Sequence, residues 1–225
     1  MPEDQVEFRA GQRYALWGSP GHAKVLGALV SRRGGQVVAL FDRHEVPSAL
    51  PGVPLWIGQT GFDRWIASLH DAGSVIALAA IGGDRGRDRL AIHALFRRHG
   101  LLVESLVHPD ASVCTTASLG AGCQVLAQAV VAAQAKLGQA CIINHRASVD
   151  HECVLGDGVH IAPGATLCGS VAVGDGAMVG AGATVLPRLN LGADSLVGAG
   201  AVVTRDVPAG AVVVGNPARV VARRH

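Results

Sequence analysis

Apolar residues recur at every sixth position through the second half of the chain. Cut into sixes from Ser105, residues 105–206 run without a slip as SLVHPD, ASVCTT, ASLGAG, CQVLAQ and so on to AVVTRD. The third residue of every hexad is Val, Leu or Ile, and the first is usually Ala, Cys, Val or Ser. An amphipathic helix repeats every three to four residues, so this period excludes a helix.

A hexad has the length of one short strand and one corner. Three hexads therefore make one triangular coil of a parallel β-helix, in which residues one coil apart stack at about the 4.8 Å spacing of neighbouring strands. The Val/Leu/Ile column is expected inside the coil. Gly, Asp and Asn gather at positions four to six, where corners need positive φ or short polar side chains. The period predicts a left-handed β-helix, an exception to the right-handed crossover rule.

The first hundred residues alternate short apolar runs with helical patterns. Strands that alternate with helices indicate a parallel sheet with helices on its faces. We therefore expect an α/β Rossmann-like domain over residues 1–104, followed by a left-handed parallel β-helix over residues 105–225. The expected strands are 13–19, 36–42, 74–82 and 101–108, and the expected helices are 21–34, 62–73 and 87–100.

Composition narrows the cellular setting. A net charge of +2 is too small for a nucleic-acid surface. Residues 1–12 are polar, unlike a signal peptide, and no apolar run reaches membrane-spanning length. Five cysteines without CxxC spacing are expected to be free thiols, with Cys123 and Cys141 filling the core. These features predict a cytoplasmic protein with no nucleic-acid or membrane partner.

The stretch VDHECVLGDGVHIAPG, residues 149–164, holds the candidate chemistry. A single histidine on a β-helix corner is commonly a surface residue. Here Glu152 follows His151 directly, and a carboxylate beside an imidazole can orient the ring and stabilise its cation. Imidazole titrates near neutral pH and suits a general base that deprotonates a nucleophile. No serine or cysteine is placed as a covalent nucleophile, so we expect direct transfer through a tetrahedral intermediate.

Two other readings of the polar residues stay open. His145, His151 and His160 suggest zinc, which needs three converging ligands. His145 and His151 lie six apart, on adjacent faces of one coil, so a neighbouring subunit would have to complete the site. The sequence GSPGH, residues 18–22, follows a strand and opens a helix, where backbone N–H groups can bind phosphate. It is only a partial dinucleotide motif, and a tight strand–helix turn without a ligand is the alternative.

The chain resembles a known family. The hexads and the ending VTRDVPAGAVVVGNPARVV, residues 203–221, resemble the hexapeptide-repeat acyltransferases. A narrower resemblance, to bacterial sugar acetyltransferases with an N-terminal Rossmann-like domain, covers nearly the whole chain. Members include nucleotide-amino-sugar N-acetyltransferases and sialic-acid O-acetyltransferase-like proteins. The stretches that carry this resemblance are GSPGHAKV (18–25), ALFD (39–42), AIGGDRGR (80–87), HPDA (108–111) and INHRASVDHECVLGDGVHIAPGA (143–165).

The resemblance implies roles for individual residues. It aligns His151 and Glu152 with the catalytic pair, His160 with a histidine near the thioester, and Asn144 with the acceptor site. Gly169, one coil after His151, is expected to offer a backbone N–H to the oxyanion. The resemblance also implies coenzyme contacts at Ala181, Ala199 and Arg219, and a nucleotide pocket of Pro20, Gly21, His22, Asp42, Gly82 and Arg87. Pro20, Arg43 and Gly83–Asp84 depart from the family pattern, which leaves the nucleotide and the sugar open.

The resemblance further implies a homotrimer with active sites between neighbouring β-helices, acetyl-CoA as co-substrate and no metal. The functional hypothesis is therefore acetyl-CoA-dependent N-acetylation of the amine of a nucleotide-linked amino sugar, with His151 as general base. Three alternatives remain: sugar O-acetylation of the sialic-acid type, a metalloenzyme like the γ-class carbonic anhydrases, and a non-catalytic scaffold.

Overall fold

The computed structural model describes residues 11–19 and 21–223. The chain divides into two compact units. The first comprises the described residues up to Ile81, together with Ala91–Glu104, and the second comprises Gly82–Leu90 and the chain from Ser105 onward. The third helix therefore contributes its first turn to the second unit and the rest of its length to the first unit.

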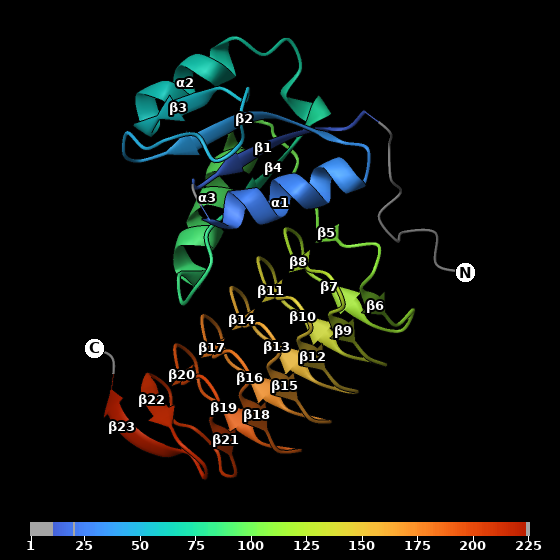
Figure 1. Cartoon of the computed structure of the whole chain (residues 1–225), viewed down its shortest axis with the longest axis vertical. Helices are drawn as coiled ribbons and strands as arrows, with labels where there is room; N and C mark the ends of the chain where they lie inside the picture. The colour runs from blue at the N-terminus through green and yellow to red at the C-terminus, as the bar shows by residue number, and fades with distance from the viewer. Residues whose placement is uncertain (1–10, 20, 224–225) are drawn as a thin grey trace. The chain divides into compact units, whose positions relative to one another are not determined.

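The first unit is built on a four-stranded parallel sheet with the order β3-β2-β1-β4. Helices alternate with the strands, as their apolar patterns predict, except that β3 follows β2 without a helix between them (Figure 1). A short 3-10 turn, Ala72–Ser74, precedes the last strand. The strands are β1 (Arg13–Trp17), β2 (Gln36–Asp42), β3 (Leu55–Ile57) and β4 (Val75–Ala79), and the helices are α1 (Gly21–Arg32), α2 (Gly58–Ala67) and α3 (Gly86–Arg98).

Aromatic side chains form the core on one face of this sheet. Trp17 and Phe41 stack with ring centroids 5.5 Å apart, and Phe41 meets Trp65 of α2 edge-on at 5.1 Å. Phe62 and Phe96 complete the cluster from α2 and α3. Successive residues of a strand point to opposite faces, so Leu16 and Leu40 are buried on the other side of the sheet. The few aromatic residues are thus concentrated in this small α/β unit.

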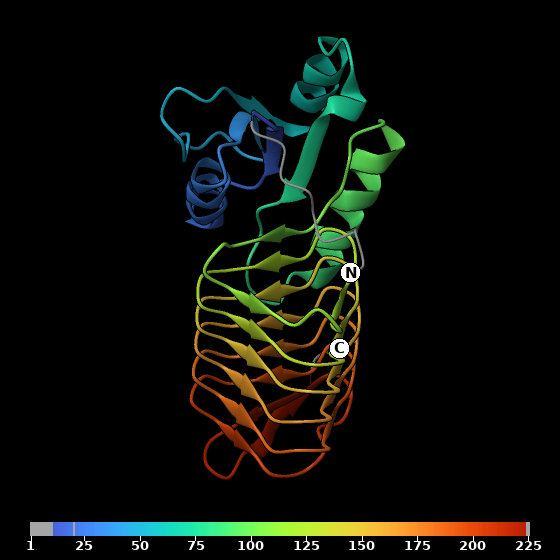
Figure 2. The same ribbon diagram turned by 90° about the vertical axis from the view of Figure 1, so that its right-hand side faces the viewer.

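The second unit consists of hexads wound into three parallel sheets (Figure 2). Apart from the last two strands, which are longer and pair antiparallel with each other, each strand is two residues long and pairs in parallel with strands one coil away, as in Ser148↔Thr166. The eight-stranded sheet contains β5 (Leu106–Val107), β8 (Gln124–Val125), β11 (Ile142–Ile143), β14 (His160–Ile161), β17 (Met178–Val179), β20 (Leu196–Val197), β22 (Ala211–Val214) and β23 (Arg219–Arg223). The six-stranded sheet contains β6 (Ser112–Val113), β9 (Val130–Val131), β12 (Ser148–Val149), β15 (Thr166–Leu167), β18 (Thr184–Val185) and β21 (Val202–Val203). The five-stranded sheet contains β7 (Ser118–Leu119), β10 (Lys136–Leu137), β13 (Val154–Leu155), β16 (Ala172–Val173) and β19 (Asn190–Leu191).

Hexad position decides the conformation and burial of each residue. The first and third positions form one continuous core that includes Cys123, Val125, Cys141 and Ile143. The sixth position adopts positive φ even where it is not glycine, as at Gln128, Ala140 and Glu152. Small or polar side chains at the corners tolerate this conformation, while β-branched residues occupy the strands. The hexapeptide repeat and the three parallel sheets fit a left-handed β-helix.

Three details differ from the sequence-based expectations. The helix expected over 62–73 begins and ends earlier, because α2 spans Gly58–Ala67 and a separate 3-10 turn covers Ala72–Ser74. The expected strand 101–108 is wrong, because Leu102 makes only an isolated bridge to Ile76 while Leu106–Val107 begins the β-helix. The short strand Leu55–Ile57 was not predicted, since three residues after a proline show no period. None of the helices in the described part of the chain is long and apolar enough to cross a membrane.

Candidate active site

His151 and Glu152 occupy the corner between β12 and β13. The Nδ1 atom of His151 lies 3.0 Å from Oε2 of Glu152. The His151 amide donates to Oδ1 of Asp150 at 2.7 Å, and Glu152 has a φ of 59°, so the corner itself fixes both side chains. A carboxylate can only accept, so Nδ1 carries the hydrogen in the neutral ring and Nε2 presents the lone pair. Both side chains are more than half exposed within one chain, at 55% and 58%.

The imidazole of His151 rests on Gly169, one coil further along. A β-carbon built on Gly169 would stand 2.5 Å from Cε1 of His151 and closer still to Nε2. The Ser170 amide donates to the His151 carbonyl at 2.8 Å, which holds the two corners in register. Glycine is therefore required at position 169 by the ring that lies over it.

The Gly169 amide is an available hydrogen-bond donor beside this ring. At two equivalent corners the preceding side chain caps the amide: Asn144 Oδ1 accepts from His145, and Asp150 Oδ1 accepts from His151. Cys168 precedes Gly169, and no acceptor for the Gly169 amide is found among residues 11–19 and 21–223. An uncapped N–H next to a base nitrogen has the geometry that an oxyanion site uses.

His160 is buried on the eight-stranded sheet and makes hydrogen bonds through both ring nitrogens. Its Nδ1 lies 3.1 Å from the Gly83 carbonyl, and its Nε2 lies 3.1 Å from Nδ2 of Asn144. Only 4% of its surface is exposed. The structure thus brings His160 together with Asn144, on a different part of the coil from His151 and Glu152.

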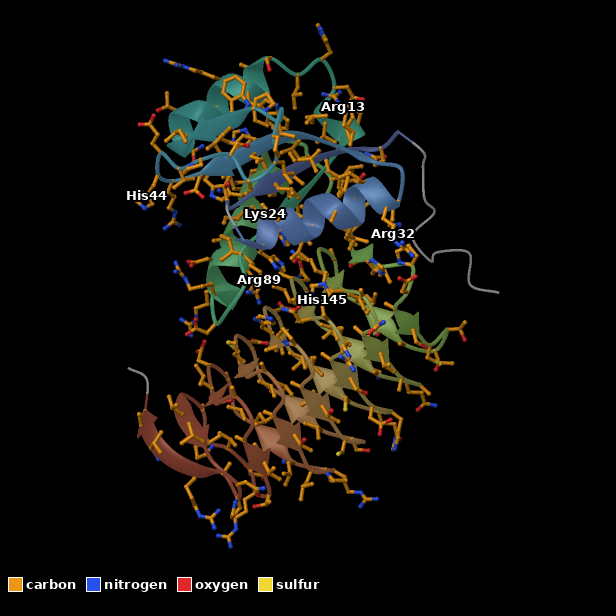
Figure 3. The ribbon with its side chains drawn as sticks, in the orientation of Figure 1. Arg13, Lys24, Arg32, His44, Arg89 and His145 are labelled. Atoms are coloured by element: carbon orange, nitrogen blue, oxygen red, sulfur yellow. The ribbon has the colours of Figure 1, made fainter. Side chains whose placement is uncertain are left out.

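Arg89 adds a buried charge that sequence reasoning missed. Its guanidinium donates to carbonyl oxygens of Ala140 at 3.0 Å, Gly158 at 2.6 Å and Gly83 at 3.3 Å. Burial lowers its pKa to about 10, so it stays charged at neutral pH. A signal for it exists in the sequence, because Arg89 shares the helical spacing of Ile92, His93 and Phe96 and so lies on the apolar stripe. Figure 3 labels Arg89 on α3 and His145 on a coil.

The expected nucleotide-pocket residues divide between the two units. Gly21 begins α1, and Asp42 ends β2 in the first unit, where its carboxylate accepts from the Ser19 amide at 2.9 Å and the His44 amide at 3.1 Å. His22 follows Gly21 on α1, whereas Pro20 lies outside the described residues. Gly82 and Arg87 belong to the second unit, where Arg87 forms a two-point ion pair with Asp194.

The expected coenzyme contacts Ala181 and Ala199 lie on the corners between the eight- and six-stranded sheets. Gly180 and Gly198 precede them and have no side chain that could cap their amides. Arg219 lies on the exposed strand β23 and donates to the Ala218 carbonyl at 2.9 Å. These residues are therefore not on the same corner as His151 within one chain.

The placement of the histidines bears on the zinc alternative. Among the described residues, no group of three or more His, Cys, Asp or Glu side chains converges as metal ligands would. His145, His151 and His160 lie on different parts of the coil.

A shallow groove crosses the five-stranded sheet, and it contains none of the expected site residues. Its lining includes Val154, Ala172, Gly174, Asn190 and Asp206.

Comparisons with known proteins agree on one family. Residues 134–169 match the bacterial transferase hexapeptide (six repeats) family model. A perosamine N-acetyltransferase from Caulobacter crescentus, a mutant solved with CoA and GDP-perosamine, superposes with a TM-score of 0.85 at 32% identity, over 93% of this chain and 96% of that chain. The chain belongs to the hexapeptide-repeat sugar acetyltransferases.

Two other solved structures extend this likeness. The acetyltransferase domain of PglB from Neisseria gonorrhoeae FA1090, in complex with acetyl coenzyme A, has a TM-score of 0.82 and 33% identity over 94% of this chain and all of that chain (100%). WeeI from Acinetobacter baumannii AYE has a TM-score of 0.82 and 27% identity over 92% and 99% of the two chains. No curated protein sequence gives a significant match. As a hexapeptide-repeat sugar acetyltransferase, the protein is an acyl-transfer enzyme.

Proposed function

We propose that this protein transfers an acetyl group from acetyl-CoA to the amine of a nucleotide-linked amino sugar. The observation that carries the proposal is the 3.0 Å contact between His151 Nδ1 and Glu152 Oε2, which leaves Nε2 as the base. The related enzyme solved with CoA and GDP-perosamine supports this substrate class. Acetyl-CoA is the co-substrate, and the chemistry requires no metal.

His151 is the general base of the proposed reaction. The sugar nitrogen attacks the thioester carbonyl carbon and forms the C–N bond, while Nε2 of His151 takes the proton from that nitrogen. The C–S bond then breaks, the electron pair leaves with sulfur, and His151 returns the proton to the departing thiolate. Glu152 orients the ring and stabilises the imidazolium that exists between these two transfers.

Gly169 supplies the oxyanion donor in this mechanism. Charge develops on the thioester oxygen in the tetrahedral intermediate, and a preorganised N–H stabilises it. The uncapped Gly169 amide beside His151 supports this role. Ala181 and Ala199 would donate their amides to the coenzyme, and Arg219 would meet one of its phosphates.

A homotrimer would complete the active site. His151, Glu152 and Gly169 lie at the corner between the six- and five-stranded sheets, whereas Asn144 and His160 lie on the eight-stranded sheet and its next corner. Threefold packing would set the base of one subunit opposite the acceptor-binding Asn144 of its neighbour and would cover the half-exposed His151. Exclusion of water by that packing strengthens electrostatic interactions at the site.

The N-terminal domain, residues 1–104, would bind the nucleotide as a Rossmann-like unit. Its parallel sheet order, and the turn from β1 into α1, support this role. In the proposed pocket, the Asp42 carboxylate accepts from the Ser19 amide, close to Gly21 and His22 at the start of α1. The free cysteines support a reducing, cytoplasmic setting.

Thiol release from acetyl-CoA tests the function. The acceptor panel contains UDP- and GDP-linked 4-amino sugars, free sialic acid and a water blank, with His151→Ala alongside. Release with one nucleotide-linked amino sugar, lost in the variant, is the expected result. Release with sialic acid alone would assign O-acetylation, and no release with any acceptor would overturn the proposal.

A further inference from the structure

The segment Gly83–Arg89 is attached to the β-helix by backbone contact. Gly86, the first residue of α3, lies directly against the main chain of Gly158. A β-carbon on Gly158 would stand 2.9 Å from Cα of Gly86, so no side chain fits between the two backbones. Even one methyl group on either glycine would therefore push the segment away from the β-helix.

Arg89, one helical turn further along α3, stabilises this contact through hydrogen bonds. Its Nη2 donates to the Gly158 carbonyl and its Nε donates to the Ala140 carbonyl, and these two residues occupy the same corner position on adjacent coils. Its Nη1 donates to the Gly83 carbonyl. A planar guanidinium presents its donors in a fixed fork, so one side chain ties two coils and the segment together.

The Gly83 carbonyl in turn determines the state of His160. A carbonyl only accepts, so His160 Nδ1, 3.1 Å away, carries a hydrogen. At the other end, the His145 amide donates to Oδ1 of Asn144 at 2.8 Å, which turns Nδ2 toward His160 Nε2. Nε2 must therefore accept. Two main-chain groups, one at each end, leave the neutral Nδ1–H tautomer as the state that satisfies both of these contacts.

We propose that Arg89 is a positioning residue that holds the Gly83 carbonyl against His160, fixes the neutral Nδ1–H tautomer of His160 and thereby directs the amide of Asn144. The inference rests on the proposed function in one respect, namely that Asn144 lines the acceptor site. One hydrogen of Asn144 Nδ2 is donated to His160, and the second is directed to an oxygen of the sugar that accepts the acetyl group. His160 thus acts through Asn144: its Nε2 is a fixed hydrogen-bond acceptor for the Asn144 amide, and the ring does not act as an acid.

Imidazole nitrogen NMR on the full-length protein tests the tautomer without any substrate. The protein is labelled with ¹⁵N-histidine, and the His160 signals are assigned by their loss in His160→Gln. The wild type is expected to show a protonated Nδ1 and an unprotonated Nε2. In Arg89→Met, His160 should interconvert between its two neutral tautomers, so that both nitrogens are partly protonated. Arg85→Met, which removes a neighbouring exposed arginine, should keep the wild-type pattern.

A second variant does not depend on the stability of the Arg89 site. Asn144→Asp keeps an acceptor for the His145 amide but replaces the donor that faces Nε2 with a carboxylate oxygen. Nε2 of His160 should then become protonated. An unprotonated Nε2 in Asn144→Asp, or a wild-type tautomer in Arg89→Met, would overturn the inference.

Kinetics separate positioning from simple loss of folded protein. With the acceptor that the wild type uses, kcat of Arg89→Met should fall about 10- to 100-fold, because small displacements at a reacting centre cost this much. The KM for acetyl-CoA should stay within about twofold, since Arg89 does not touch the proposed coenzyme contacts. Arg89→Lys keeps the charge without the fork and should restore little of kcat. A wild type inactive with every acceptor would overturn the proposed function, while the NMR result would still decide the tautomer.

Discussion

The imidazole of His151 lies on the backbone of Gly169, exactly one coil further along the β-helix, with no room for a methyl group between them. The same corner carries the hydrogen bond from the Ser170 amide to the His151 carbonyl. The position of the base is therefore a property of the stacked coils. A single glycine sets the height of the ring above the corner.

Gly169→Ala should displace the His151 ring and lower kcat about 10- to 100-fold, because misplacement by the width of a methyl group costs this much at a reacting centre. Thiol release at saturating acetyl-CoA measures it. Gly164→Ala is the matched control, since Gly164 occupies a sixth hexad position with open space around it and Ala140 already adopts positive φ at such a position. Equal activity of the two variants would contradict the stacked arrangement.

Glu152→Gln should lower kcat with little change in folding. Glutamine fits the corner, because Gln128 and Gln134 adopt the same positive φ at the same hexad position. The amide cannot stabilise the imidazolium as a carboxylate does, so we expect a loss smaller than that of His151→Ala, for which removal of a general base predicts about 10²- to 10⁴-fold. Parallel measurements of kcat and of thermal unfolding check this. A larger loss in Glu152→Gln than in His151→Ala would argue against the assigned roles.

Asp42→Ala should raise KM for the nucleotide-linked sugar and leave KM for acetyl-CoA unchanged. The Asp42 carboxylate accepts from the Ser19 and His44 amides, so its loss releases the turn that precedes α1. Asp42→Asn retains one acceptor and should show a smaller effect. Initial rates with each substrate varied in turn distinguish the two constants, and an equal rise in both would show general disruption.

Gly86→Ala should destabilise the second unit. The added β-carbon would stand 3.0 Å from the carbonyl carbon of Gly158 and closer still to its oxygen, and overpacking of this kind costs about 1–3 kcal/mol. Urea unfolding gives the change in the free energy of unfolding. Arg85→Ala, one residue earlier and exposed, is the control and should unfold at the wild-type midpoint.

Cys114 should react with a disulfide reagent at a lower pH than Cys153 does. Its Sγ lies 3.3 Å from Oγ1 of Thr116, and this hydrogen bond lowers the pKa of Cys114, whereas burial raises the pKa of Cys153. The thiolate is the reactive form, so a lowered pKa moves the rise in rate to lower pH. Rates of modification by a disulfide reagent against pH test this in Cys114→Ser and wild type. Thr116→Val should move the profile back to higher pH, and an unmoved profile would refute the cause.

The hexad pattern predicted the β-helix strand by strand because its period is a direct image of the coil. From Val125 to Val203, each third residue is buried as the pattern requires, whereas the third residues of the first three hexads are partly buried. The α/β half was predicted less well at its edges. The run 101–108 looks like one strand, but Leu102 pairs with β4 while Leu106–Val107 starts the β-helix. Local apolarity cannot say which of two sheets a short strand joins, since pairing depends on distant residues.

The candidate site also contains residues that the sequence indicated and residues that it did not. His151 next to Glu152 was visible because both lie in one corner, and Gly169 because the stacking distance is fixed by the repeat. The link from His160 to Gly83 spans most of a domain in sequence, and no local pattern indicates it. Arg89 lies on an apolar helical stripe, and this signal is present in the sequence but is easily taken for a solvated surface charge.

The sequence by itself determined the coil, its interior column, its corners and the pairing of His151 with Glu152, because each of these depends on residues at most one coil apart. Only the tertiary structure decided that a buried arginine holds Gly83 against His160, that both ring nitrogens of His160 are used within the chain, and that Arg87 pairs with Asp194. These relationships need main-chain carbonyls and side chains brought together from distant segments. Main-chain groups are the same at every residue, so the sequence carries no trace of which of them a buried charge will meet.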